Sequence, residues 1–132
     1  MHTCEVGLDM IGIARIERAA SRWGERFLHR VFSERELQQC RGRAESLAAR
    51  FAAKEALLKA LGTGLMRGIR WTDVEILHNS AGAPYVTLHG MAATIAQKKG
   101  LDHWRVSLTH SDDMAAAMVV GWGCQDDDKF LK

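Results

Sequence analysis

The sequence has few of the features that mark exported, membrane-bound or disulfide-linked proteins. The chain of 132 residues contains no apolar run of about 18 residues, the length needed to span a membrane. The polar start Met1–Thr3 also lacks the apolar region of a signal peptide. Its three cysteines are odd in number, far apart and without metal-site spacing, which fits reduced thiols. We therefore expect a cytoplasmic protein that is neither exported nor embedded in a membrane.

Excess charge and metal-binding motifs are also missing. The net charge of +2 does not support the broad basic field of a nucleic-acid-binding protein. The six histidines show no H-E-x-x-H or similar spacing, which argues against a metal-dependent hydrolase. By length the chain is one domain, which we assign to residues 1–123, followed by a polar C-terminal tail at 124–132.

Apolar periodicity and turn residues predict an α+β domain in which an antiparallel sheet packs against helices. Ser33 and Glu36 form a capping box, which predicts the start of a helix. The expected elements, in order, are a strand at 6–13, helices at 13–31, 33–40 and 44–61, a hairpin at 71–78 and 85–88, a helix at 89–99, and a second hairpin at 104–110 and 114–122.

The helix expected over 44–61 is the most informative segment. It is rich in Ala, Leu, Lys and Glu, contains no proline, and meets Gly62 as its C-terminal stop. Its charged side chains stand among apolar residues rather than on a separate solvated stripe: Arg50, Lys54, Glu55 and Lys59. On pattern alone they form either ordinary helical pairs or a site for a phosphorylated ligand and a metal.

Asp9 raises a similar question, because it lies in an apolar strand. A carboxylate among apolar neighbours must be paired, hydrogen-bonded or bound to a cation. The pattern leaves two interpretations open, a cap for the following helix and a metal ligand.

A basic stripe follows in the expected helix at 13–31, where arginines recur at steps of three and four. Most such stripes are solvated surfaces, but here like charges stand together with few acids beside them, which favours an acidic partner. The alternative function is therefore a non-catalytic module that binds a carrier protein or RNA through the stripe. RNA binding requires exposed aromatic side chains, whereas Trp23 and Phe27 fall at core steps. The stripe comprises Arg15, Arg18, Arg22, Arg26 and Arg30.

Three segments together resemble a known family. The run Arg50-Phe51-Ala52-Ala53-Lys54-Glu55-Ala56, followed by Lys59-Ala60-Leu61-Gly62-Thr63-Gly64, is similar to the signature helix of the holo-acyl-carrier-protein synthases, the small 4′-phosphopantetheinyl transferases. Gly7-Leu8-Asp9 with Ile11, and Val106-Ser107-Leu108-Thr109-His110-Ser111, also match in the family's order and spacing. The resemblance covers nearly the whole chain.

This resemblance implies an activity. Relatives transfer 4′-phosphopantetheine from coenzyme A to a serine of an apo acyl carrier protein and release adenosine 3′,5′-bisphosphate. Acids matching Asp9 and Glu55 hold Mg²⁺ against the diphosphate, and lysines matching Lys54 and Lys59 contact phosphate oxygens. We expect Asp9, Glu55 and Lys59 to be catalytic, with Glu55 as the candidate proton acceptor.

The resemblance also implies the remaining contacts. His110 is expected at a coenzyme A phosphate, Arg50 at the 3′-phosphate, and Gly82 and Pro84 beside the adenine. Relatives of this short type are homotrimers with the coenzyme A cleft between subunits, so we expect a homotrimer. The low net charge and the lack of an apolar span lead us to expect no nucleic-acid or membrane partner. Whether the carrier serves fatty acid or secondary metabolism stays open. Within the basic stripe, the expected carrier-binding residues are Arg15, Arg18 and Arg22.

Overall fold

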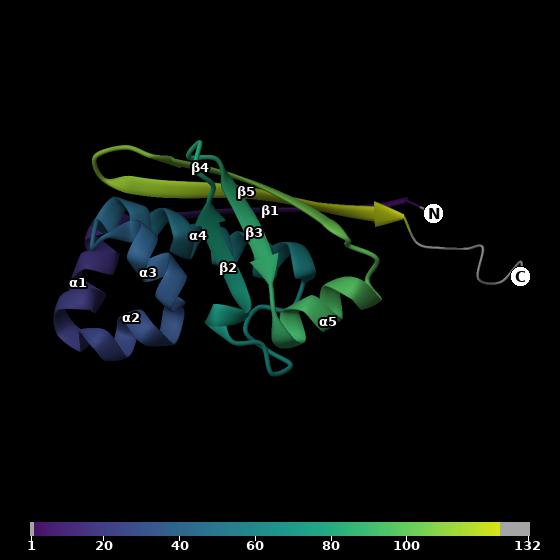
Figure 1. Ribbon diagram of the computed structural model, residues 1–132, viewed down its shortest axis with the longest axis horizontal. Helices are drawn as coiled ribbons and strands as arrows, with labels where there is room; N and C mark the ends of the chain where they lie inside the picture. The colour runs from purple at the N-terminus through teal and green to yellow at the C-terminus, as the bar shows by residue number, and fades with distance from the viewer. Residues whose placement is uncertain (1, 125–132) are drawn as a thin grey trace, which may run out of the picture.

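The computed structural model describes residues 2–124 and shows an α+β domain with two antiparallel sheets (Figure 1). The α+β class is confirmed, although two sheets stand where one was expected. Of the predicted tail at 124–132, Cys124 belongs instead to a strand, and residues 125–132 lie outside the described residues. One sheet has the order β1 (His2–Gly12), β5 (Met114–Cys124), β4 (His103–His110), and the other pairs β2 (Val74–His78) with β3 (Pro84–Leu88).

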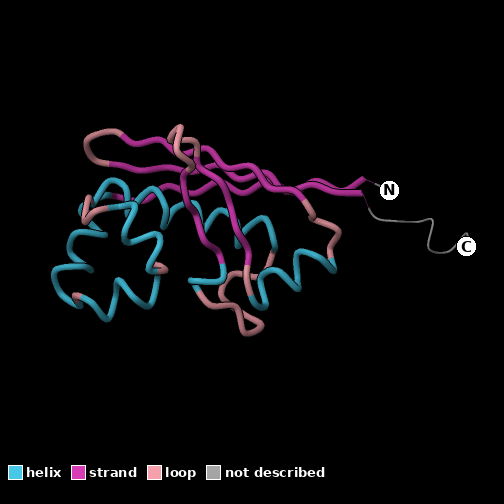
Figure 2. Tube along the Cα trace, viewed as in Figure 1, coloured by secondary structure: helices cyan, strands magenta, loops and turns pink. Residues whose placement is uncertain are grey.

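The helices all lie on one side of the three-stranded sheet (Figure 2). Three short helices gather at one end of the molecule, the longest runs beneath the three-stranded sheet, and the last lies at the other end. No helix within residues 2–124 is long and apolar enough to cross a membrane. The helices are α1 (Ile13–Trp23), α2 (Glu25–Val31), α3 (Glu34–Cys40), α4 (Ala44–Leu61), the 3₁₀ turn η1 (Trp71–Asp73) and α5 (Gly90–Lys98).

The single helix predicted over 13–31 is wrong, because the chain breaks at Gly24. This residue has φ of +56°, a conformation that glycine adopts without steric cost, and its N–H donates to the Ala20 carbonyl at 2.8 Å. Arg26 and Arg30 therefore lie on α2, a different helix from the first three arginines of the stripe.

Two local predictions are confirmed in detail. Ser33 Oγ accepts from the Glu36 N–H at 3.2 Å, and Glu36 Oε1 accepts from the Ser33 N–H at 2.9 Å, which completes the capping box. The β2–β3 hairpin closes on the pair His78 and Pro84, although its first strand begins at Val74, because Trp71–Asp73 form the 3₁₀ turn η1. In its turn, Asn79 Oδ1 accepts backbone N–H groups, which stabilises the reversal of the chain.

The closest backbone approach that positions the site lies between β1 and α4. A Cβ atom placed on Gly7 would lie 1.7 Å from the Ala56 carbonyl oxygen, so only glycine lets this strand lie so near the helix. Both residues are buried. The contact brings the β1 residue two positions further on, Asp9, alongside the second half of α4.

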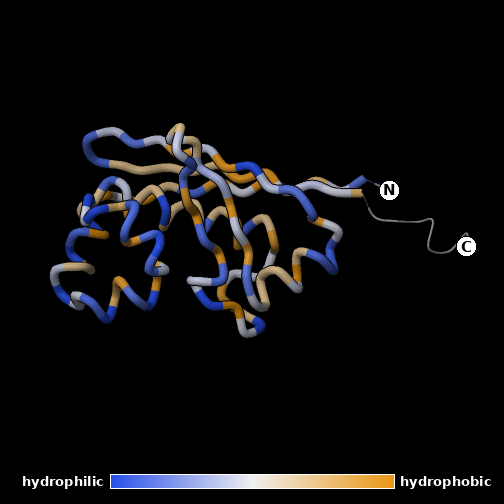
Figure 3. Tube along the Cα trace, viewed as in Figure 1, coloured by the Kyte–Doolittle hydropathy of each residue, from blue (hydrophilic) through white to orange (hydrophobic). Residues whose placement is uncertain are grey.

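The three-stranded sheet has an apolar outer face as well as an inner one. Along β1, Gly7, Asp9 and Ile11 face α4, while the intervening side chains point away from it. Val6, Leu8 and Met10 are 60%, 64% and 64% exposed, and Met118 and Trp122 of β5 are also exposed. Figure 3 shows hydrophobic segments along these strands, in contrast to the more hydrophilic α1.

Candidate active site

A first cluster forms where β1 meets the C-terminal half of α4. Lys59 Nζ lies 2.8 Å from Asp9 Oδ1 and also donates to the Leu8 carbonyl oxygen at 3.1 Å. The hydrogen bond to Asp9 raises the pKa of Lys59 above its ordinary value. Lys59 therefore stays a cation at the edge of the cluster, with its side chain open to solvent.

Glu55 completes this cluster. Burial raises the pKa of its carboxyl group, and the charge of Asp9 raises it further, whereas Lys59 and Arg15 act in the opposite direction. The two carboxylates are therefore close enough to repel each other. The structure brings together the three residues expected to be catalytic: Asp9, Glu55 and Lys59.

The donor set fits Mg²⁺ by its chemistry. This ion usually takes one or two carboxylates from a protein and completes its shell with water and substrate phosphates. Two neighbouring acids meet that need, and Asp9 can accept from Lys59 while keeping other acceptor positions. Among residues 2–124, no group of three or more His, Cys, Asp or Glu side chains forms a metal site made only from protein ligands.

The surroundings of Lys54 do not fit its expected role as a phosphate contact. Its side chain is fully buried, and its ammonium group lies 2.8 Å from Glu36 Oε1 while donating to the carbonyl oxygens of Trp71 and Val74. Burial lowers the pKa of Lys54, and the Glu36 carboxylate opposes that shift. With all three hydrogens engaged by the protein, Lys54 is a structural residue rather than a phosphate ligand.

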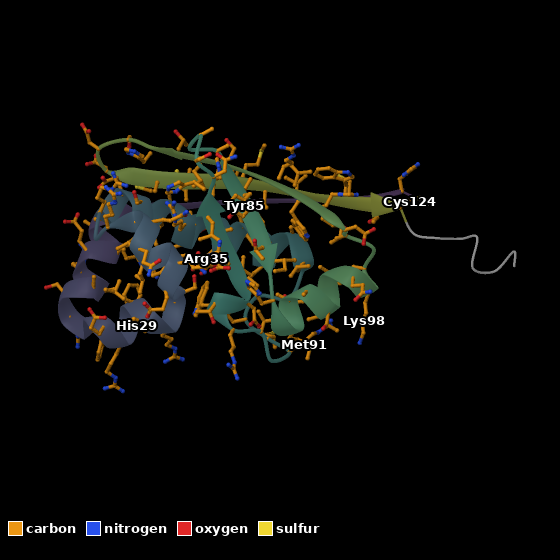
Figure 4. All side chains as sticks on the ribbon, viewed as in Figure 1. His29, Arg35, Tyr85, Met91, Lys98 and Cys124 are labelled. Atoms are coloured by element: carbon orange, nitrogen blue, oxygen red, sulfur yellow. The ribbon has the colours of Figure 1, made fainter. Side chains whose placement is uncertain are left out.

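The buried ion pair is part of a wider polar network around Glu75 of β2. Burial alone would raise the pKa of this carboxyl group, but hydrogen bonds from Ser33 at 2.6 Å and His89 at 2.9 Å lower it overall. Arg35 of α3 lies beside β2 in Figure 4, 4.0 Å from Glu75. These contacts join α3, the β2–β3 hairpin and the start of α5.

A second cluster lies at the N-terminal half of α4. Arg50 is 6% exposed and lines an open cavity of about 360 Å³ together with Gly82 and Pro84. The structure therefore brings together the three residues expected at the nucleotide end. Arg43 and His78 line the same cavity and were not anticipated from the sequence.

His110 stands apart from that lining. It is exposed at the end of β4, and its Nδ1 lies 3.4 Å from the Ser111 carbonyl oxygen. Along β4 it is two residues from Leu108, which lines the cavity, so both side chains point to the same face of the sheet. His110 itself does not line the cavity.

The basic stripe begins beside the carboxylate cluster. Arg15, Arg18 and Arg22 are exposed on α1, and Arg15 is near enough to lower the pKa of Glu55. The expectation that Trp23 is a core residue is wrong, since it is 55% exposed with the Arg22 guanidinium 5.0 Å above its ring. Gly24 ends α1 directly after Trp23, so the apolar periodicity does not continue through it.

Glu36, His78 and Arg43 are among the residues whose roles in these networks sequence reasoning missed. Glu36 was assigned only a capping role, because pattern does not reveal a buried lysine 18 positions away. His78 and Arg43 stand at the end of a strand and before a helix, where polar side chains are ordinary. The one available signal was the position of His78 at the turn that presents Gly82 and Pro84.

Comparisons with known proteins agree with this geometry. An α+β domain with paired carboxylates, a neighbouring lysine and a separate cationic cavity fits an enzyme that handles a phosphorylated ligand. The family model of the 4′-phosphopantetheinyl transferase superfamily matches residues 5–119. The chain belongs to this superfamily and is a transferase.

Individual relatives cover almost the same length. A holo-[acyl-carrier-protein] synthase of Herpetosiphon aurantiacus is 49% identical over 123 residues, which is 89% of this chain and 97% of the relative. The crystal structure of the Helicobacter pylori synthase in complex with coenzyme A has a TM-score of 0.80 at 32% identity, covering 88% of this chain and 98% of that one. The Bacillus anthracis synthase in complex with coenzyme A (3′,5′-ADP) has a TM-score of 0.74 at 29% identity, covering 91% and 96%.

The structural role of Lys54 can be tested by replacing it with methionine. Lys54→Met leaves the Glu36 carboxylate buried without its partner, so the free energy of unfolding should fall by about 3–5 kcal/mol. Urea unfolding measures this loss. The double variant Lys54→Met with Glu36→Gln should recover part of the stability, and Lys98→Met, at an exposed position of α5, serves as the control. If Lys54→Met is as stable as the parent protein but binds coenzyme A more weakly, the interpretation of Lys54 as a phosphate contact would be restored.

Proposed function

We propose that this protein transfers the 4′-phosphopantetheine group of coenzyme A to a serine of an apo acyl carrier protein, in a Mg²⁺-dependent reaction that releases adenosine 3′,5′-bisphosphate. The observation that best supports this proposal is the close approach of β1 to α4, which gathers Asp9, Glu55 and Lys59. The named activity of relatives that match nearly the full chain supports the same reaction.

In this reaction the carrier serine oxygen attacks the phosphorus that bears the pantetheine arm. A new P–O bond forms, the bond to the bridging diphosphate oxygen breaks, and its electron pair leaves with the adenosine bisphosphate. Glu55 accepts the serine proton, a role that requires hydrogen-bond reach of the nucleophile. Lys59, a cation beside Asp9, stabilises negative charge on the leaving side.

Mg²⁺ held by Asp9 and Glu55 would supply charge neutralisation at the diphosphate. Phosphoryl transfer places few other demands on a protein, because its transition state is loose and its charge is spread over nonbridging oxygens. Positioning and charge complementarity therefore carry most of the catalysis.

The nucleotide end of coenzyme A belongs in the cavity at the other half of α4. Arg50 would contact the 3′-phosphate, and Gly82 and Pro84 would border the adenine. We assign His110 to a phosphate as well, since it is exposed on the sheet face that Leu108 shares with the cavity. Because Arg50 and Lys59 are nine residues apart and so face opposite sides of α4, we expect the coenzyme A cleft to lie between subunits, as the resemblance implies.

The carrier protein would approach over α1. Arg15, Arg18 and Arg22 are exposed there, and Arg15 adjoins the carboxylate cluster where the serine must arrive. An acidic carrier surface complements this cationic helix.

We also propose a homotrimer in which the outer face of the three-stranded sheet is covered by other copies of the chain. Val6, Leu8 and Met10 form an exposed apolar row that an isolated small protein rarely leaves in water. Sedimentation equilibrium should give three times the chain mass, and Leu8→Glu should produce monomers. A monomeric parent protein would refute this assembly.

The activity is tested by intact-mass spectrometry of an apo acyl carrier protein incubated with the enzyme, coenzyme A and Mg²⁺. We expect the carrier to gain one phosphopantetheine group. Glu55→Gln and Asp9→Asn should each lower kcat/KM by about 100-fold or more, since each removes charge complementarity from the transition state. A chelator should abolish the gain.

Glu5→Gln on the same strand is the matched control and should keep full activity. Mass gain that survives a chelator and both substitutions would rule out the metal-assisted mechanism. An unchanged carrier mass with several different apo carriers would contradict the transferase activity itself.

The carrier surface is tested by charge reversal. Arg22→Glu should raise the KM for the carrier about tenfold and weaken its dependence on salt, because a favourable charge pair becomes a repulsive one. The affinity for coenzyme A should not change. Lys98→Glu lies at the far end of the molecule, on α5 in Figure 4, and is the control. Equal carrier kinetics in parent and Arg22→Glu proteins would exclude α1 as the docking surface.

A further inference from the structure

The hydrogen bonds of Arg50 leave part of its guanidinium group without a partner. Nη1 donates to the Ser46 carbonyl oxygen at 3.3 Å, and Nη2 lies 2.7 Å from His78 Nδ1. The buried Nε has no partner among the described residues. A buried cation with an unused donor is unfavourable unless an acceptor arrives, so Arg50 is prepared for an anionic ligand in the cavity that it lines.

The contact between Arg50 and His78 defines the state of the imidazole. A guanidinium group can only donate, so His78 Nδ1 must accept and therefore carries no proton in this arrangement. Protonation of Nδ1 would replace the hydrogen bond with contact between two cations.

His78 is held in place independently of Arg50. The side-chain amide of Gln39 on α3 donates to the His78 carbonyl oxygen at 2.9 Å and accepts from its N–H at 2.8 Å. On the other side, His78 pairs with Pro84 at the end of the hairpin. Since two other elements fix the backbone of His78, its ring can orient the longer and more flexible Arg50 side chain.

The charges around this ring are unbalanced. Facing His78 are Arg50 from α4, the neutral Gln39 from α3 and the neutral Pro84 from β3. Arg43, just before α4, is the other cation lining the cavity, and no carboxylate appears among its described lining residues. The cavity is therefore suited to a doubly charged anion, and the imidazole contributes an acceptor rather than further charge.

We propose that His78 is a positioning residue that holds Arg50 for the 3′-phosphate of coenzyme A, and that it acts through an unprotonated Nδ1. The proposal rests on the proposed function, which supplies coenzyme A as the ligand. It makes His78 responsible for selecting coenzyme A over 3′-dephospho-coenzyme A.

The test is calorimetric titration of the full chain with coenzyme A and with 3′-dephospho-coenzyme A at pH 8. His78→Ala should reduce the preference for coenzyme A about tenfold, the scale of one charge-assisted hydrogen bond. Its affinity for the dephospho form should stay within about twofold, which also shows that the site is folded. His78→Asn should keep the preference, because its amide oxygen replaces Nδ1 as an acceptor. His29→Ala on α2 is the control.

The outcomes also separate this inference from the proposed function. Tight coenzyme A binding with the same preference in His78→Ala and parent proteins would overturn the role of His78 and leave the transferase proposal intact. Absence of coenzyme A binding and of carrier modification by the parent protein would overturn both. Loss of preference in His78→Ala together with its retention in His78→Asn supports the inference.

Discussion

The contact between the backbone of β1 and α4 is the constraint on which the site depends. Gly7 has no side chain and Ala56 has a minimal one, so strand and helix meet at a distance that excludes even a Cβ atom. Asp9 and the α4 residues Glu55 and Lys59 come from positions about 50 apart in the chain, and this contact makes them neighbours. If strand and helix lay further apart, the two carboxylates would each be solvated separately and could not bind one cation together.

The long helix serves two purposes with one set of charged residues. Lys54 is surrounded by the protein and holds α3 and β2 against α4 through Glu36 and backbone carbonyl groups. Arg50 and Lys59, one turn before and a little more than one turn after it, face open regions at either side. The buried ion pair thus stabilises the helix that carries the chemistry, and it contributes no ligand contact itself.

Local signals in the sequence predicted the elements well, because capping, turns and alternation depend on neighbouring residues. The Ser33–Glu36 capping box and the hairpin closed at Pro84 are examples. Predictions failed where distant residues decide the outcome. The partner of Lys54 is Glu36 from another helix, and the break at Gly24 ends the periodicity that had placed Trp23 in the core. The resemblance to a family supplied expected roles for Asp9 and Glu55, whereas the contact of His78 with Arg50 joins residues 28 positions apart and is visible only in the folded structure.

Because an α-helix rises by a constant amount per residue, the number of residues between two positions of α4 fixes their distance along the helix axis. Nine residues separate Arg50 from Lys59, which corresponds to about 14 Å along a helix axis at 1.5 Å per residue. The two cationic regions are therefore held at a set spacing by a rigid, buried rod rather than by loops. At about 100° per residue, the two cations also face nearly opposite sides of that rod. A single inserted residue would lengthen that span and also turn one cation by about 100° relative to the other.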